Sequence, residues 1–397
     1  MKNATDLDVS NSQYFYCQLK IDDIEIMPLN VMHISIREWI IDLVPRLHLA
    51  LKDDGMLTEL FQLKSNKNIT VVLGKYENDE NSIKASFSLH DYKIEPVGNN
   101  QLFMIEITAL LDISNFYSPI YNRAFQSKTS LECFSQISGE CGLTLKKSTN
   151  LSVFDKMTWY QINQTNFQFL KHVLNRSFRS NDVLFGYVDI KNNLNFKSIE
   201  LEQNNRNIKA DYDHINFAKN EFNDKEDENI IWYNYYNVIN ISGTNNKINN
   251  NGVKYGYYNL SSKQEDSVFD NSSKFADKSF TDSQSNVDYY NSIVQNNVHN
   301  NYARSIAQNK YLKTKLFGYA LTLNINPIIN VNLLDNVSVK VPSVGIHTTA
   351  QNINDRMSGR YFIGGIVYSA GKNKTYTKQL ILFRDGYNEK NEQEYDL

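Results

Sequence analysis

The chain has 397 residues, enough for two or three domains with separate cores, and its 41% hydrophobic residues are typical of a globular protein. Its net charge of -3 excludes the basic footprint of a nucleic-acid-binding protein. Three cysteines cannot build a disulfide framework, and the N-terminus lacks the apolar core of a secretory signal, so we expect synthesis in a reducing cytoplasm. The sequence contains no run of about 18 apolar residues, so we expect no transmembrane helix.

Residues 14–112 are predicted to form a β-rich domain that follows a flexible N-terminus at residues 1–13. Runs such as YFYCQLKI and QLFMIEITALL are rich in strand-forming residues and are bounded by polar turns. The segment MHISIREWIIDLVPRLHLAL is ambiguous, because residues 33–38 alternate as in a strand whereas the residues around Trp39 to Leu47 follow helical spacing. The sequence does not decide between the two there.

Residues 113–200 are predicted to form an α+β domain. Ser127 or Thr129 can cap a helix through LECFSQIS, and Gly139 is expected to end it. Further along, the residues from Lys191 to Asn193 are expected to turn a β-hairpin, because Asn tolerates the left-handed backbone of such turns.

A second helix in this domain has the clearest start signal in the chain. Thr165 and Gln168 form a capping-box pattern, in which each side chain satisfies a backbone donor of the other residue. Apolar residues then recur at helical spacing, and Lys171 points away from them. The predicted buried stripe consists of Phe167, Leu170, Val173 and Leu174.

Residues 201–386 are predicted to form a second β domain, followed by an acidic tail at residues 387–397. A polar excursion at residues 261–297 offers little to bury and is expected to be a flexible loop, the first site of cleavage in limited proteolysis. The clearest strand follows it, with alternating apolar residues from Phe317 to Ile325. Gly364-Gly365 interrupts a later strand and predicts a bulge or a close backbone approach.

The titratable residues do not form a recognisable catalytic pattern. The seven histidines are scattered, and Cys133 and Cys141 are more consistent with core thiols than with a redox pair. Residues 211–214, Asp-Tyr-Asp-His, are the only cluster resembling a metal site, but adjacent side chains on a strand cannot all face one ion. We therefore expect no catalytic, cofactor-binding or metal-ligating residue, and no enzyme.

Two other features have alternative interpretations. The acidic run at residues 221–228 could pair with a basic partner, although such runs are usually just solvated. The aromatic stretch IIWYNYYN, residues 230–237, could bind sugars as in a lectin, but a barrel core plus a protein interface explains it better.

Three stretches together resemble a known family. They are KTSLECFSQISGECGLTL; TWYQINQTNFQFLKHVLNRSF followed by LFGYVDIKNNLNFKSI; and GYALTLNINPIINVNLLDNVSVKVP followed by RYFIGGIVYSAGKNKTYTKQLILFRDG. Their order resembles the central hub proteins of bacteriophage tails and baseplates, and the related hub region of type VI secretion spike proteins. The resemblance spans most of residues 12–386, with Leu334-Asp335-Asn336 where the family often has a Pro-Gly turn.

The resemblance implies a mainly β, α+β fold, with two tube-like antiparallel β-barrel domains and an inserted α+β domain. It also implies a structural, late-expressed virion protein made in the host cytoplasm. This protein would be a homotrimer that joins the tail tube protein to the central spike protein and surrounds a channel for the tape-measure protein and for DNA in transit, without membrane insertion. The alternatives are a tail-associated cell-wall hydrolase and a secreted glycan-binding β protein. Against them stand the lack of a leftover domain of about 100 residues and the lack of a signal peptide.

Overall fold

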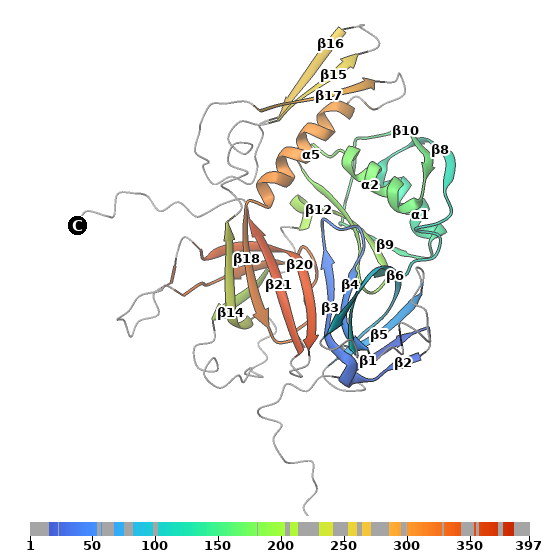
Figure 1. The fold of residues 1–397 in the computed structure, drawn as a ribbon. Coiled ribbons are helices and arrows are strands. Elements are labelled where there is room, and N and C mark those ends of the chain that lie inside the picture. Colours follow the sequence, from blue (N-terminus) through green and yellow to red (C-terminus); the bar gives the residue numbers. More distant parts are fainter. Residues whose placement is uncertain are drawn as a thin grey trace, which may run out of the picture.

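The computed structural model describes residues 16–22, 24–53, 57, 67–74, 82–97, 102–180, 182–202, 207–212, 230–240, 253–259, 264–270, 286–294, 299, 301–327, 329–342, 353–354, 357–371 and 376–384. The predicted flexible N-terminus, the acidic run at 221–228 and the acidic tail at 387–397 lie outside these residues. Figure 1 shows two groups of strands side by side, with the α+β domain and a long helix, α5, on one end of them.

The N-terminal domain is a sheet of seven strands in the order β3-β4-β7-β6-β5-β1-β2. Every pairing within it is antiparallel, and no ladder among the described residues closes it into a barrel. A short 3-10 helix, η1 (Pro28–Asn30), connects β2 to β3. The strands are β1 (Tyr16–Ile21), β2 (Ile24–Ile26), β3 (Val31–Trp39), β4 (Arg46–Asp53), β5 (Asn68–Gly74), β6 (Ile83–Val97) and β7 (Leu102–Leu111).

The ambiguous segment of the sequence is a strand pair. β3 and β4 are antiparallel, and Arg37 lies directly opposite Arg46. Ile34 and Ile36 are fully buried on β3, and Leu47 is fully buried on β4, so both strands place alternate residues in the core. The helical spacing that the sequence shows between the two strands falls in the connecting turn.

The α+β domain combines small sheets with two capped helices. Its elements are β8 (Tyr121–Lys128), α1 (Ser130–Glu140), β9 (Thr144–Lys147), β10 (Met157–Gln164), α2 (Asn166–Arg176), β11 (Leu184–Val188), β12 (Asn193–Ser198) and α3 (Ile199–Glu202). Strands β8 and β10 form a two-stranded sheet, and β11, β12 and β9 form a three-stranded one. The predicted hairpin between β11 and β12 is confirmed, with Asn192 in the left-handed region at φ 60°.

Both helices begin as the sequence predicts. Thr129, rather than Ser127, forms a capping box with Glu132 at the start of α1. Thr165 forms the predicted capping box with Gln168 at the start of α2. The predicted end of α1 at Gly139 is wrong, because the helix continues to Glu140 and Gly142 supplies the left-handed residue at φ 67°.

The buried stripe of α2 differs from the prediction by one position. Leu170, Val173 and Leu174 are buried as predicted, but Phe167 is only half-buried and Phe169 is fully buried. The ring of Phe169 stacks on Phe125 of β8 with centroids 4.8 Å apart. The stripe is wider than the periodicity indicates, because α2 is covered on more than one side.

The C-terminal domain is a closed six-stranded barrel in the order β19-β13-β14-β18-β21-β20, and β20 pairs back to β19. Two ladders, β13 with β14 and β13 with β19, are parallel, so the barrel is not antiparallel throughout as predicted. The strands are β13 (Asn207–Tyr212), β14 (Ile230–Asn240), β18 (Tyr319–Ile325), β19 (Asn336–Val339), β20 (Gly359–Gly371) and β21 (Tyr376–Arg384).

A three-stranded sheet and a helix separate β14 from β18. The sheet consists of β15 (Val253–Asn259), β16 (Gln264–Asp270) and β17 (Asn286–Val294), and the helix is α5 (Tyr302–Leu316). The expectation of a loop at residues 261–297 is therefore wrong for β16 and β17. Both strands contain apolar residues, such as Val268 and Ile293, that low overall hydropathy concealed. The rest of the excursion lies outside the described residues.

The predicted mainly β fold with an inserted α+β unit is confirmed. Among the described residues, the C-terminal domain closes into a six-stranded barrel, and the N-terminal strands form an antiparallel sheet. Among the described residues, no helix combines the length and apolar character needed to span a membrane.

Replacing Leu170 with Ala should lower the free energy of unfolding by about 2–5 kcal/mol, because a fully buried side chain leaves a cavity. Lys171→Ala on the exposed face of the same helix is the matched control and should change it by about 0.5 kcal/mol or less. Denaturant titration measures both, and equal losses at the two positions would contradict this packing of α2.

Candidate functional site

In the part of the chain that the structure describes, no three His, Cys, Asp or Glu residues are placed to hold a metal ion. Asp211 forms an ion pair with Lys340 at 3.2 Å, and Asp213 and His214 lie outside the described residues. Burial raises the pKa of Cys141 to about 11, which is consistent with the predicted role as a core thiol.

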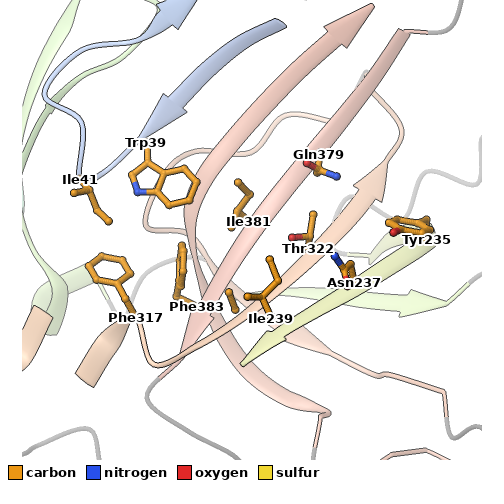
Figure 2. A pocket seen from close by; sticks show the side chains of 11 residues that line it. Trp39, Ile41, Tyr235, Asn237, Ile239, Phe317, Thr322, Gln379, Ile381 and Phe383 are labelled. Atoms are coloured by element: carbon orange, nitrogen blue, oxygen red, sulfur yellow. The ribbon is translucent and has the colours of Figure 1, made fainter. Parts of the chain in front are cut away.

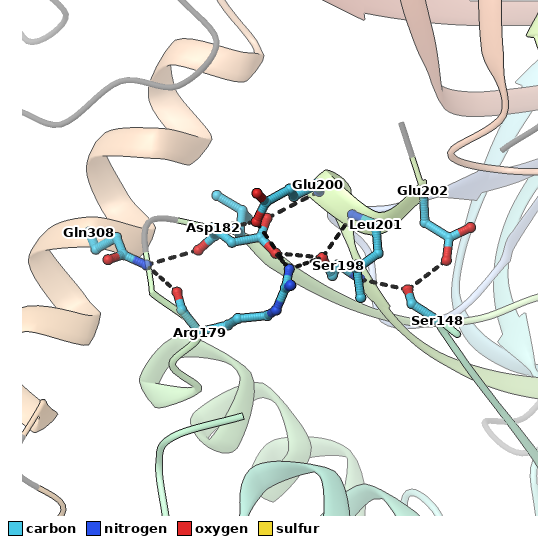
Figure 3. Close-up of polar contacts among 9 residues, drawn as sticks. Ser148, Arg179, Asp182, Ser198, Glu200, Leu201, Glu202 and Gln308 are labelled. Atoms are coloured by element: carbon cyan, nitrogen blue, oxygen red, sulfur yellow. Dashed lines mark hydrogen bonds and ion pairs between the residues drawn. The ribbon is translucent and has the colours of Figure 1, made fainter. Parts of the chain in front are cut away.

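A buried polar cluster surrounds Asp182 (Figure 3). Its carboxylate accepts hydrogen bonds from the Ser198 hydroxyl, from the Arg179 guanidinium at 2.5 Å and from the Val183 amide at 2.7 Å. On α5, the Gln308 side chain donates to the backbone carbonyls of Arg179 and Asp182, both at 2.9 Å. These contacts fasten α5 to the α+β domain.

A second buried contact links the α+β domain to the barrel. The Ser148 hydroxyl donates to the Glu202 carboxylate at 2.5 Å and accepts from the Ser198 amide at 3.0 Å. The Asn336 side chain on β19 donates to the Glu202 carbonyl at 2.9 Å. These polar groups are engaged with one another and with backbone, so the two clusters join the α+β domain to α5 and to the barrel.

The feature that organises the molecule is the ladder between β3 and β20. Seven residue pairs, from Gly365 opposite Trp39 to Gly371 opposite His33, join the N-terminal sheet to the C-terminal barrel. The two domains therefore share one sheet of thirteen strands. A ladder of this length makes independent rotation of the two domains impossible without breaking backbone hydrogen bonds.

The predicted bulge at Gly364-Gly365 is confirmed, and so is the close approach. The register with β21 shifts between Ile363 and Gly365. A Cβ atom on Gly365 would lie 2.8 Å from the Trp39 ring, and one on Gly364 would lie 2.3 Å from the Phe383 ring. The glycines thus allow two aromatic rings to pack directly against the backbone at the junction.

On its inner side, the junction encloses a buried carboxylate and a buried amine. Glu38 of β3 accepts a hydrogen bond from the Ile190 amide of the α+β domain at 2.5 Å. Lys378 of β21 donates to the Ile329 carbonyl at 2.6 Å. Burial raises the pKa of Glu38 to about 7 and lowers the pKa of Lys378 to about 8. Residues from all three domains therefore meet at this point.

On its outer side, the shared sheet presents continuous rows of directly opposed side chains. One row crosses seven strands from β14 to β7, and a second crosses six strands from β21 to β6. The first row consists of Tyr235, Asn324, Gln379, Val367, Arg37, Arg46 and Leu110. The second consists of Thr377, Ser369, Ser35, His48, Thr108 and Asp91. This outer face is mostly polar and carries charges of both signs.

A cavity of about 400 Å³ opens on the outer face where the two domains meet (Figure 2). Trp39 and Ile41 form its N-terminal wall, and Phe317 together with outward residues of β14, β18 and β21 forms the rest. Ile41 is 56% exposed and Ile239 is 46% exposed, so apolar surface is open to solvent here. Such a patch on a mostly polar face is typical of an interaction site.

The second half of β6, within the N-terminal sheet, has an open strand edge. β6 pairs with β5 only along residues 83–88, whereas residues 91–97 pair only with β7. Among the described residues, the other edge of this half of β6 has no ladder partner. Lys93 and Pro96 lie on it, and residues of these types protect an edge against unspecific pairing.

Sequence reasoning missed Glu38, Lys378 and the opposed arginines, Arg37 and Arg46. All four lie on strands, and a charged residue in a strand sequence does not by itself indicate on which face of the sheet its side chain lies. Reading the segment around Pro45 as a strand pair would have placed the two arginines on one face, because an antiparallel pair connected by a turn fixes its register.

The fold is shared with two solved tail proteins, one of them from a prophage. A tail protein from Neisseria meningitidis MC58 aligns with a TM-score of 0.55 and 10% identity over 94% of this chain and 97% of its own. The 43 kDa tail protein of prophage MuSo2 from Shewanella oneidensis aligns with a TM-score of 0.54 and 10% identity over 94% of this chain and 100% of its own. The resemblance seen in the order of the sequence elements is thus confirmed as a common fold.

No protein-family model matches the sequence, and no curated protein matches it. At 10% identity, the two tail proteins show the fold of this chain and do not show its activity or partners.

Replacing Glu38 with Gln should change the pH dependence of stability. Burial in the folded state raises the pKa of this carboxyl to about 7, against about 4.3 in an unfolded chain. The contribution of protonated Glu38 to the free energy of unfolding is therefore complete below pH 4.3 and is lost as pH rises through 7. Gln keeps the acceptor for the Ile190 amide and cannot ionise, and the nearby charges of Asp189, Lys191 and Lys378 are unchanged.

The variant should therefore gain stability relative to the native protein between pH 4.5 and pH 7.5, by an amount on the order of 3 kcal/mol. Thermal or denaturant unfolding across this range measures the difference. Glu106→Gln, which removes an exposed carboxylate from the same sheet, is the control. A constant difference between Glu38→Gln and the native protein would show that Glu38 does not titrate as described.

Proposed function

We propose that this protein is the structural hub of a phage tail or baseplate, a homotrimer that joins the tail tube to the central spike. The observation that carries the proposal is the β3–β20 ladder, which makes one chain present two sheet domains side by side on a common outer face. Three such chains would place six sheet domains around an axis. A trimer of this kind can match six-fold symmetry at one end and three-fold symmetry at the other.

The solved tail proteins support the proposal because they share the fold of this chain over nearly its whole length. They cover 94% of this chain, and the chain covers 97% and 100% of them. The shared architecture therefore includes both sheet domains and the α+β unit and is not limited to one common barrel.

The outer face is our proposed lining of the channel for the tape-measure protein and for DNA in transit. From β18 to β20 its two rows of side chains are Asn, Gln, Thr, Ser and Val, and the arginines of these rows are Arg37 and Arg46, too few for the cationic stripe that would hold a polyanion. A heterologous ring contact needs two different patches on each subunit, and the open half of β6 is our candidate for one of them.

We also propose that the protein is not an enzyme. The buried carboxylates of the α+β domain are held by backbone amides, serine hydroxyls and an arginine, and the cavity is lined mainly by apolar side chains. A cell-wall hydrolase would need two carboxyl groups, or a nucleophile and a base, that converge on a cleft.

Native mass spectrometry of the protein with its tail tube and spike partners tests the assembly. The expected complex contains three copies of this 46.0 kDa chain. A stable monomer that ignores those partners would contradict the hub proposal.

Zymography on peptidoglycan with purified protein tests the absence of hydrolytic activity, and no clearing is expected. Clearing that disappears when one carboxylate is replaced would establish the hydrolase alternative instead.

A further inference from the structure

A pair of arginines lies beside the apolar cavity, and the fold described above assigns no role to their opposed charges. Arg37 and Arg46 are directly opposed on the outer face of β3 and β4. Like charges in directly opposed positions destabilise a sheet, so their presence needs a compensating interaction. The only carboxylate that contacts either guanidinium in the described residues is that of Asp42, which lies 3.1 Å from Arg46.

The positive charge of the pair contributes to lowered pKa values of neighbouring groups. Burial lowers the pKa of His48, and the charges of Arg46, Arg37 and His33 lower it further. Burial also lowers the pKa of Lys171 on α2, and Arg46 adds to that effect. Arg37, Arg46 and Lys171 thus share one acidic neighbour, Asp42.

Both guanidinium groups also have capacity for further hydrogen bonds. The Nε atoms of Arg37 and Arg46 are buried and have no hydrogen-bond partner among the described residues. A guanidinium binds carboxylate through two parallel hydrogen bonds, one of which can come from Nε. Because the Nε atoms are covered, an incoming carboxylate would bind the outer nitrogens of the guanidinium groups, and the Arg46 side chain is 42% exposed.

The arginines and the cavity form one surface because they share residues. The Arg37 guanidinium lies 3.8 Å from the centre of the Trp39 ring, and Trp39 also forms a wall of the cavity. Ile41, another wall residue, directly precedes Asp42, the partner of Arg46. Figure 2 shows Trp39 and Ile41 on one side of the cavity, facing Phe383 and Ile381.

The cavity is large enough for apolar side chains of a partner. Its volume of about 400 Å³ exceeds, by a factor of about two to three, the ~150 Å³ of an apolar cavity that holds benzene. Its lining offers few groups to read the edge of a base, and two arginines do not follow a repeating phosphate backbone. The combination fits a protein segment with apolar and acidic residues better than a nucleic acid.

We propose that this surface is a docking site for a segment of another protein, in which a large apolar side chain enters the cavity and an adjacent Asp or Glu binds Arg37 and Arg46. Charge complementarity identifies the occupant as acidic, and the apolar lining identifies its anchor as Leu, Ile, Met or Phe. The proposal goes beyond the hub function, since the site exists in each chain whether or not a trimer forms.

Isothermal titration calorimetry with three blocked synthetic peptides on the full chain tests the site. The probe Gly-Glu-Leu-Glu-Phe-Glu-Gly should bind, and its affinity should fall when salt is raised. The charge-reversed Gly-Lys-Leu-Lys-Phe-Lys-Gly and the anchor-free Gly-Glu-Ser-Glu-Ser-Glu-Gly should bind at least about tenfold more weakly, because each lacks one half of the match.

Two variants at exposed positions locate the binding without threatening the fold. Arg46→Gln, whose native side chain is 42% exposed, should weaken binding of the first peptide about tenfold or more. Ile239→Glu should abolish it, by placing a carboxylate in the cavity. Ile162→Glu is the matched control, because Ile162 is a 65% exposed isoleucine on β10, outside the cavity lining, and should leave binding unchanged.

Absence of binding at millimolar peptide, equal binding of the charge-reversed peptide, or native affinity in both site variants would each overturn the docking site. Thermal unfolding confirms that the variants are folded. The trimer measurement is separate, so a monomer that binds the peptide refutes the hub alone, and a trimer that does not bind refutes the docking site alone.

Discussion

The backbone ladder between β3 and β20 is the constraint on which the rest of the structure depends. It is a short contact between segments more than 300 positions apart in the sequence, and it makes two sheet domains into one sheet. Each backbone hydrogen bond contributes only about 0.5–1.5 kcal/mol, but breaking the ladder would expose all of them together with Trp39 and its neighbours. The domains are therefore held in one relative orientation by regular secondary structure and not by side-chain contacts alone.

The remaining features of the junction follow from that ladder. Close strand approach at the bulge requires glycine, so Gly365 lies against the Trp39 ring. The strands bring Glu38 and Lys378 into an interior where neither is well solvated, and the turn after β11 supplies an amide to Glu38. The α+β domain is thereby anchored at the same place, which couples the orientation of all three domains to one small volume of the core.

Local features of this fold could be predicted from the sequence, and long-range ones could not. Capping at Thr129 and Thr165, the hairpin turn at Asn192 and the bulge at Gly364-Gly365 depend on residues within a few positions of each other. Their chemistry is visible in the printed sequence.

The β3–β20 ladder, the parallel pairings of β13 and the opposed arginines depend on which strands become neighbours, and no local pattern encodes that. The strands β16 and β17 were missed for a different reason. Their apolar and aromatic residues stand within a longer stretch dominated by Ser, Asn and Asp, so composition favoured a loop.

Hydrogen exchange of the isolated protein, followed by mass spectrometry of peptides from β3 and β20, tests most directly whether the two sheets are one body. The account predicts that amides in the β3–β20 ladder exchange as slowly as those between β20 and β21 inside the barrel, and that both are released together on unfolding. Exchange in the β3–β20 ladder that is orders of magnitude faster than in the barrel would show two independent domains and would contradict it.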